Sequence, residues 1–419
     1  MSRVSLSLVV LCVCAAPAAA EPLTIAQAVD EAIAHNLSLL AERTSLTIAD
    51  AAMITARLRP NPVLSGSADH LDLLGTGFDE TNNGGPPEIA WRVDLPIERG
   101  GKRDARIAVA AAAKSLAEAQ LSDAVRVLRQ DVTLACIDLM AAQAARALVT
   151  DNLRTFEDLA RVNRARVTAG AIAPSESMRS EVALQQFRVT AVRAELDLVT
   201  AAAKLATLLG RPPGDTIEIG DPLRAEESLA AVDALSLETA AFDARPDLAV
   251  LRFTAARTIA DLRLQEAMGQ VDYTLGAEYR RQQGIAGRSN SLGFFVSTPL
   301  PVFNRNQGEI ARATAEHTQA SQEMAARRAQ IAAEVRAASR EYETMRGLVA
   351  TIERDVMGPA TKARETSAYT YRAGAGTLLE LLDAQRAFND TMQSYVDVQA
   401  GLRRAVARLN AAVGEEVVR

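Results

Sequence analysis

Residues 102–169 read KRDARIAVAAAAKSLAEAQLSDAVRVLRQDVTLACIDLMAAQAARALVTDNLRTFEDLARVNRARVTA, a stretch without glycine or proline. Apolar residues recur in it at spacings of three and four, as at Val125, Leu128, Val132 and Ala135. That spacing puts side chains on one face of an α-helix, so the stretch predicts a single helix. At about 1.5 Å per residue the helix would be roughly 100 Å long. A helix of this length needs neighbours, and we expect a coiled coil or bundle.

Three further stretches have the same character. Residues 175–209 lack glycine and proline, a third run begins near Gln307 and continues past Gly358-Pro359 to 373, and a fourth covers 377–413. Of the 419 residues 48% are apolar but only 4% aromatic, which favours long helices over a large β core. A net charge of −6 with this apolar content excludes a disordered chain and a nucleic-acid binder that relies on bulk charge.

Short regions between these helices alternate apolar and polar residues, which predicts strands. They are residues 87–97, 271–280 and 292–296, with 61–71 as a weaker fourth candidate. One face carries the aromatic residues Trp91, Tyr273, Tyr279 and Phe294. The alternation suits strands with lipid on one side and water on the other; a half-buried sheet in a soluble protein is the alternative. The opposite face would place these charges in a hydrated lumen: Glu88, Arg92, Asp94, Asp272, Glu278 and Arg280.

The chain contains an internal repeat. Ala169-Gly170-Ala171 matches Ala373-Gly374-Ala375 at an offset of 204 residues, and Leu209-Gly210 matches Val413-Gly414 at the same offset. Leu95-Pro96-Ile97 matches Leu300-Pro301-Val302 at an offset of 205. Each half therefore reads helix, strand, strand, long helix, turn, long helix. We expect a first repeat at 21–210, a linker at 211–234 and a second repeat at 235–419.

The N-terminus is typical of a signal peptide spanning residues 1–20. Arg3 precedes an apolar segment at 6–16, and Ala18-Ala19-Ala20 provides a small-residue cleavage site; a buried N-terminal helix is the alternative. Cys12 and Cys14 would be removed with it, and neither follows the small residue that acylation needs. Cys136 would remain as a buried, inert thiol. No later uninterrupted apolar run reaches the length of a transmembrane helix, so we expect export without a helical anchor.

Four strands cannot close a barrel, and unpaired strand edges are not tolerated in a bilayer. Symmetric association solves this problem most simply: three copies would supply twelve strands and twelve long helical segments. The expected product is a hollow channel, with its strands in a membrane and its helices extending away from it.

The whole mature chain resembles the TolC family of outer-membrane efflux proteins. Two motifs resemble its CzcC-type branch, which is associated with heavy-metal export by RND pumps: Glu98-Arg99-Gly100-Gly101-Lys102-Arg103, and residues 299–308, PLPVFNRNQG. Arg59-Pro60-Asn61-Pro62 also fits. The resemblance implies a homotrimer in the outer membrane of a Gram-negative bacterium, in contact with its lipids. It further implies a 12-stranded β-barrel, an α-helical periplasmic tunnel, a periplasmic adaptor protein and an inner-membrane RND pump.

The resemblance also assigns roles to the helix turns. In the family these turns form the periplasmic tip that meets the adaptor, here 167–176 and 372–383; an ordinary turn without a partner is the alternative. The tip residues are Gly170, Ala171, Glu176, Gly374, Gly376 and Thr377. Acidic residues after the second turn, Glu380 and Asp383, correspond to a periplasmic gate, or else to a solvated helix face. Gly376 stands where some members carry an arginine, so we expect this gate to be held differently.

No catalytic, cofactor-binding or metal-binding constellation is recognisable. His35, His70 and His317 are scattered and lack metal-ligand spacing, and neither a phosphate-binding loop nor a nucleophile motif is present. We expect a passive conduit rather than an enzyme, exporting heavy-metal cations. Export of drugs, other small molecules or polypeptides is the alternative within the family, and a soluble periplasmic coiled-coil scaffold is the alternative outside it.

Overall fold

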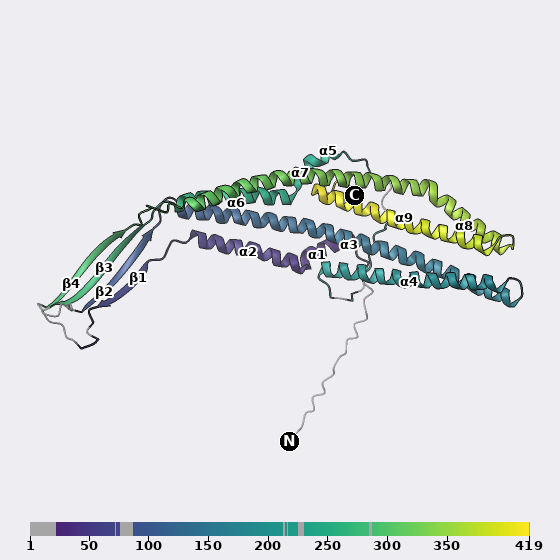
Figure 1. Ribbon diagram of the computed structural model, residues 1–419, viewed down its shortest axis with the longest axis horizontal. Coiled ribbons are helices and arrows are strands. Elements are labelled where there is room, and N and C mark those ends of the chain that lie inside the picture. The colour runs from purple at the N-terminus through teal and green to yellow at the C-terminus, as the bar shows by residue number, and fades with distance from the viewer. Residues whose placement is uncertain are drawn as a thin grey trace, which may run out of the picture.

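The computed structural model describes residues 22–71, 73–75, 87–212, 214–215, 217–224, 230–284 and 287–418. The predicted signal peptide at 1–20, Cys12 and Cys14 lie outside the described residues, as does most of the loop expected between the first two strands. The described part is an elongated molecule with a small sheet at one end and two helix turns at the other (Figure 1).

The described residues of the first half form four helices and two strands. In order they are α1 (Ile25–His35), α2 (Leu37–Arg57), β1 (Val63–Asp69), β2 (Glu88–Ile97), α3 (Lys102–Thr168) and α4 (Pro174–Leu209). The helix break between α1 and α2 comes from Asn36, whose side chain caps α2 by accepting from the Leu39 N–H at 3.0 Å.

The second half repeats this order. It contains α5 (Ala234–Ala244), α6 (Pro246–Met268), β3 (Tyr273–Gly284), β4 (Gly287–Ser297), α7 (Gln307–Thr351), a π-helical turn η1 (Ile352–Val356), α8 (Met357–Arg372) and α9 (Leu378–Val413). Both halves thus begin with two helices rather than the one expected. The third long helical stretch expected from the sequence is divided by the π-turn into α7 and α8, whereas its counterpart α3 is continuous.

The four predicted strands are present and form one antiparallel sheet in the order β1-β2-β3-β4. Trp91 of β2 lies opposite Gly66 of β1 and Tyr279 of β3, so the aromatic side chains share one face. This face is open: Trp91 is 55% exposed and Phe294 of β4 is 79% exposed. Within the described residues β1 and β4 each pair on one side only, so the sheet has two free edges there.

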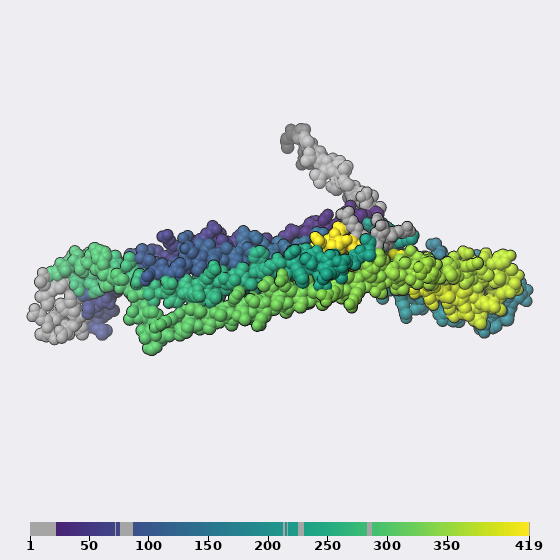
Figure 2. Space-filling model, turned by 90° about the horizontal axis from the view of Figure 1, so that it is seen from above, coloured from purple at the N-terminus to yellow at the C-terminus, as the bar shows by residue number. Residues whose placement is uncertain are grey.

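The long helices form a layer in which each helix packs on the next. α4 packs on α3, α3 on α9 and α9 on α8, so that α4 and α8 lie at opposite edges of the layer near the tip (Figure 1). Figure 2 shows the same rod from above, with the first-half helices (purple to blue) beside those of the second half (green) along much of its length. The mainly helical fold with long antiparallel hairpins and a small β part is therefore confirmed.

Three apolar cores hold the helices together. One surrounds Val132, Cys136 and Leu139 of α3. Its counterpart in the second half surrounds Val335 and Tyr342 of α7. The third joins the two hairpins near their turns, around Phe156. Within the described residues α3 alone also contains an 18-residue window, of mean hydropathy 1.5, that could cross a membrane by length and composition. Its packing on several helices accounts for that apolar character.

Candidate functional site

The two hairpin turns lie at the same end of the molecule, opposite the sheet (Figure 1). Gly170 and Gly374 adopt φ of 70° and 75°, a left-handed conformation that favours glycine. The turns are closed by equivalent backbone bonds: the Ala171 N–H donates to the Arg166 carbonyl at 2.8 Å, and Ala375 to Thr370 at 2.9 Å. The sequence-predicted tip residues therefore come together in two matching turns.

The second turn is tighter than the first around Gly376. A Cβ atom at this position would lie 2.8 Å from Oγ1 of Thr370, so a larger residue would force a shift. Thr377 is the N-cap of α9. Glu176 lies in the first turn of α4, where the positive end of the helix dipole stabilises its carboxylate.

Glu380 and Asp383 both project from the start of α9, but in different surroundings. Glu380 completes a capping box: its carboxylate accepts from the Thr377 N–H at 2.9 Å, while the Glu380 N–H donates to Oγ1 of Thr377 at 3.3 Å. The Asp383 side chain is 62% exposed, with Arg386 3.9 Å away. The sequence already contained the signature Thr-x-x-Glu, so the capping role of Glu380 was recognisable.

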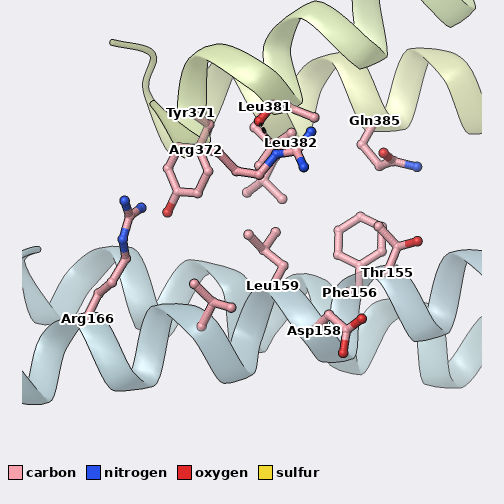
Figure 3. A pocket seen from close by; sticks show the side chains of 12 residues that line it. Thr155, Phe156, Asp158, Leu159, Arg166, Tyr371, Arg372, Leu381, Leu382 and Gln385 are labelled. Atoms are coloured by element: carbon pink, nitrogen blue, oxygen red, sulfur yellow. Dashed lines mark hydrogen bonds between the residues drawn. The ribbon is translucent and has the colours of Figure 1, made fainter. Parts of the chain in front are cut away.

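A contact between the two hairpins was not foreseen from the sequence. The Tyr371 hydroxyl of α8 donates to Oδ1 of Asn163 in α3 at 2.7 Å, and Asn163 is fully buried. The guanidinium of Arg166 lies 5.4 Å from the centre of the Tyr371 ring (Figure 3). Further from the tip, Gln385 of α9 donates to Oδ1 of Asn152 at 3.4 Å.

A pocket of about 490 Å³, partly open to solvent and lined by both apolar and polar residues, lies between these two polar contacts. Figure 3 shows Leu159 and Phe156 of α3 facing Leu381, Leu382 and Gln385 of α9 across it.

Two buried amide groups lie beside the pocket at this contact. The Nδ2 groups of Asn163 and of Asn389, a neighbour of Gln385, have no hydrogen-bond partner among the described protein residues.

The predicted strand charges form an ion-pair network on the face opposite Trp91. Arg92 binds Asp94 at 2.9 Å and lies across from Glu278, while Arg280 pairs with both Glu278 and Glu88. The sixth residue requires a correction: Asp272 lies just before β3 and is not a strand charge. Its carboxylate accepts from Lys102 Nζ at 2.7 Å and so joins the sheet to α3.

The two junction motifs, residues 98–103 and 299–308, occupy equivalent positions where strands pass into helices. Gly101 and Asn306 cap α3 and α7 with φ of 71° and 65°. Glu98 pairs with Arg106 of α3, and the Asn306 side chain donates to the Gln265 carbonyl of α6 at 2.8 Å. These residues fix the angle between the sheet and the helical layer.

The described residues hold no group of three or more His, Cys, Asp or Glu side chains arranged to bind a metal ion. His35 lies 3.2 Å from the Glu31 carbonyl, and His317 lies 3.4 Å from the Thr258 hydroxyl. The Cys136 thiol is completely buried, and burial raises its pKa to about 12.

The sequence matches the family model "Outer membrane efflux protein" over residues 28–211 and again over 238–415. It is 26% identical to the cobalt-zinc-cadmium resistance protein CzcC of Cupriavidus metallidurans, over 94% of this chain and 91% of that protein. It is also 26% identical to the pyoverdine export outer membrane protein OpmQ of Pseudomonas putida, over 91% of this chain and 83% of that protein.

Among solved structures, the outer-membrane channel OprN superposes with a TM-score of 0.75 at 19% identity. The superposition covers 93% of this chain and 89% of that one. At this identity the likeness concerns the fold.

Proposed function

This chain belongs to the outer membrane efflux protein family, and we propose that three copies of it form the outer-membrane channel of a tripartite RND-type efflux system. The channel is a passive conduit from the periplasm to the exterior, and its cargo is heavy-metal cations. One observation carries the proposal: amphipathic strands with two free edges continue directly into helical hairpins whose longest helix has 67 residues.

The free edges explain why several copies are needed. In a bilayer the unpaired N–H and C=O groups of β1 and β4 have no water to bind, so pairing β4 of one copy with β1 of the next satisfies both. The same association closes the helical layer, because α4 and α8 lie at its two edges. The apolar face around Trp91 would then meet lipid, and the charged face around Arg92 would meet water.

The tip supports two further roles. Gly170, Ala171, Glu176, Gly374, Gly376 and Thr377 form the surface that we assign to adaptor docking. A three-fold axis near α9 would bring three copies of Glu380 and Asp383 together as carboxylate rings. Such rings favour cations and disfavour anions, which agrees with metal export.

Heavy-metal cargo is supported by the similarity to CzcC and by the two junction motifs. The chain is as identical to the pyoverdine export protein OpmQ as it is to CzcC, so export of small molecules, drugs or polypeptides is the second candidate function. Family membership argues against a soluble scaffold. A conduit performs no covalent chemistry, so we do not assign an enzymatic activity.

The test is a deletion of the gene in its own host, complemented with the full chain. We expect the deletion to lower tolerance to Zn²⁺, Co²⁺ and Cd²⁺ and to raise their intracellular concentrations, as measured by mass spectrometry. Tolerance to detergents and hydrophobic antibiotics should be unchanged. Lost antibiotic tolerance with normal metal content would contradict the metal assignment.

A further inference from the structure

The pocket between the hairpins has the composition of a small-molecule site. Its volume of about 490 Å³ lies within the range of about 300–1,000 Å³ that such sites occupy. Leu159 of α3 faces Leu381 and Leu382 of α9 across it (Figure 3). The Phe156 wall is held in place, because its ring stacks on that of Phe187 of α4 with the ring centroids 4.1 Å apart. The apolar part of the pocket is therefore preformed.

Two guanidinium groups line the same pocket from opposite walls. Arg166 comes from α3 and Arg372 from α8 (Figure 3). Arg166 lies 5.4 Å from the centre of the Tyr371 ring, and Nε of Arg372 donates to the Ala368 carbonyl at 3.1 Å. Within the described residues neither guanidinium pairs with a carboxylate. Both positive charges are therefore available to a ligand.

The charge of the lining favours an anion. Asp158 is the one acidic side chain among the described lining residues, and it already pairs with Arg161. A guanidinium binds a carboxylate through charge-assisted hydrogen bonds, which Arg166 and Arg372 can both supply. The apolar walls favour a ligand that also has an apolar body, because covering them removes apolar surface from water. The lining thus combines the two features that recognise an organic anion.

We propose that this pocket binds a small organic anion, with its carboxylate at Arg166 and Arg372 and its apolar body between Leu159 and Leu381. The pocket lies within one chain, so the proposal requires no association of copies. The ligand class also differs from the metal cations proposed as cargo. A ligand in this position contacts both hairpins. Because those contacts are lost when the hairpins separate, binding stabilises the arrangement in which they lie together.

The experiment titrates naphthoate into the full chain in detergent by calorimetry, with protein-free micelles as the blank. Naphthalene methanol has the same rings without the charge, and acetate has the carboxylate without the apolar body. We expect naphthoate to bind at least about tenfold more tightly than naphthalene methanol, and acetate to give no measurable heat of binding. An equal affinity of either analogue and naphthoate would overturn the proposal.

Two variants locate the binding. Arg166→Gln with Arg372→Gln should weaken naphthoate binding at least about tenfold while helical circular dichroism is unchanged. The matched control is Arg154→Gln, because Arg154 is exposed on α3 and lies outside the pocket lining. Equal weakening in the control, or none in the double variant, would overturn the role of the two arginines. Bound naphthoate should also slow amide hydrogen exchange in residues 372–383, and unchanged exchange there would contradict a ligand that bridges the hairpins.

Native mass spectrometry of the same samples separates this proposal from the proposed function. Trimers that fail to bind naphthoate would overturn the ligand site and leave the channel standing. Monomers that bind naphthoate, with the affinity lost in the double arginine variant, would support the ligand site and contradict the channel.

Discussion

Asn36 and Arg245 make equivalent hydrogen bonds in the two halves of the chain. Asn36 Nδ2 donates to the Leu208 carbonyl at 2.9 Å, and a guanidinium nitrogen of Arg245 donates to the Ala412 carbonyl at 3.0 Å. The two acceptors are 204 residues apart, near the ends of α4 and α9. In each half this hydrogen bond connects the C-terminal end of the last helix, α4 or α9, to the junction between the first two helices. Only the second half uses a charged residue, so it requires buried counter-charges.

Acidification should weaken that charged junction. Burial raises the pKa of the Asp247 carboxyl, but hydrogen bonds and charge from Arg245 and Arg327 outweigh this and lower the pKa to about 2, from an ordinary 3.8. A depressed pKa contributes stability above the ordinary value, and this stability is lost as the pH falls toward 2. We expect Asp247→Asn to cost about 2 kcal/mol of unfolding free energy at pH 7 and clearly less at pH 2.5.

Denaturant titrations followed by circular dichroism would measure this difference. The exposed Asp151 provides the control, since Asp151→Asn should change little at either pH. Equal losses for Asp247→Asn at both pH values would show that its carboxylate is not held in the charged form by the fold.

Removing one hydroxyl should loosen the two hairpins. Tyr371→Phe deletes the bond to the buried Asn163, whose Oδ1 then loses the donor that the Tyr371 hydroxyl supplies. We expect the free energy of unfolding to fall by about 1–3 kcal/mol. Amide hydrogens in residues 372–383 should exchange faster, and the channel should open more often. Tyr369→Phe is the control, because Tyr369 is 70% exposed on the same helix. Equal exchange rates in the two variants would refute the role of the Tyr371 contact.

The Cys136 thiol should not react in the folded protein. It is completely buried and its pKa is about 12, so thiolate is scarce at neutral pH. We expect no maleimide labelling of the folded chain within hours at pH 7.5 and complete labelling in denaturant, as read by mass spectrometry. Rapid labelling before unfolding would mean that the core around α3 opens easily.

The carboxylates at the start of α9 should set ion selectivity. Glu380→Gln with Asp383→Asn keeps an acceptor for the capping box, since glutamine can also bind the Thr377 N–H. We therefore expect unchanged thermal stability but a lower preference for cations, measured as a reversal-potential shift across a salt gradient. The matched control is Glu176→Gln, which lies after the first hairpin turn, at the start of α4. An identical reversal-potential shift in this control would contradict a gate role for Glu380 and Asp383.

The sequence was informative wherever local chemistry decides the structure. Missing glycine and proline predicted α3, and alternation predicted β2 together with the exposed face of Trp91. Asp272 falls one residue before β3, and the partner that its carboxylate binds, Lys102, is 170 residues distant in the chain and leaves no local pattern. The Tyr371–Asn163 bond spans 208 residues and leaves no local pattern.

Two other features were hidden for different reasons. The π-turn at Ile352–Val356 has no residue signature that separates it from an α-helix. The capping box at Thr377 has the signature Thr-x-x-Glu, but the same Glu380 also fits the expected gate, so the sequence pattern allows two roles for it. Local signals thus predicted the elements, whereas the contacts between hairpins required the structure.

The most direct test of the central claim is conductance of the purified full-length chain in planar lipid bilayers. The account predicts trimers that insert and produce discrete, cation-preferring current steps, with larger open probability for Tyr371→Phe. A chain that stays monomeric in the soluble fraction, or inserts without conducting in both the wild-type and Tyr371→Phe forms, would contradict the assignment as a channel.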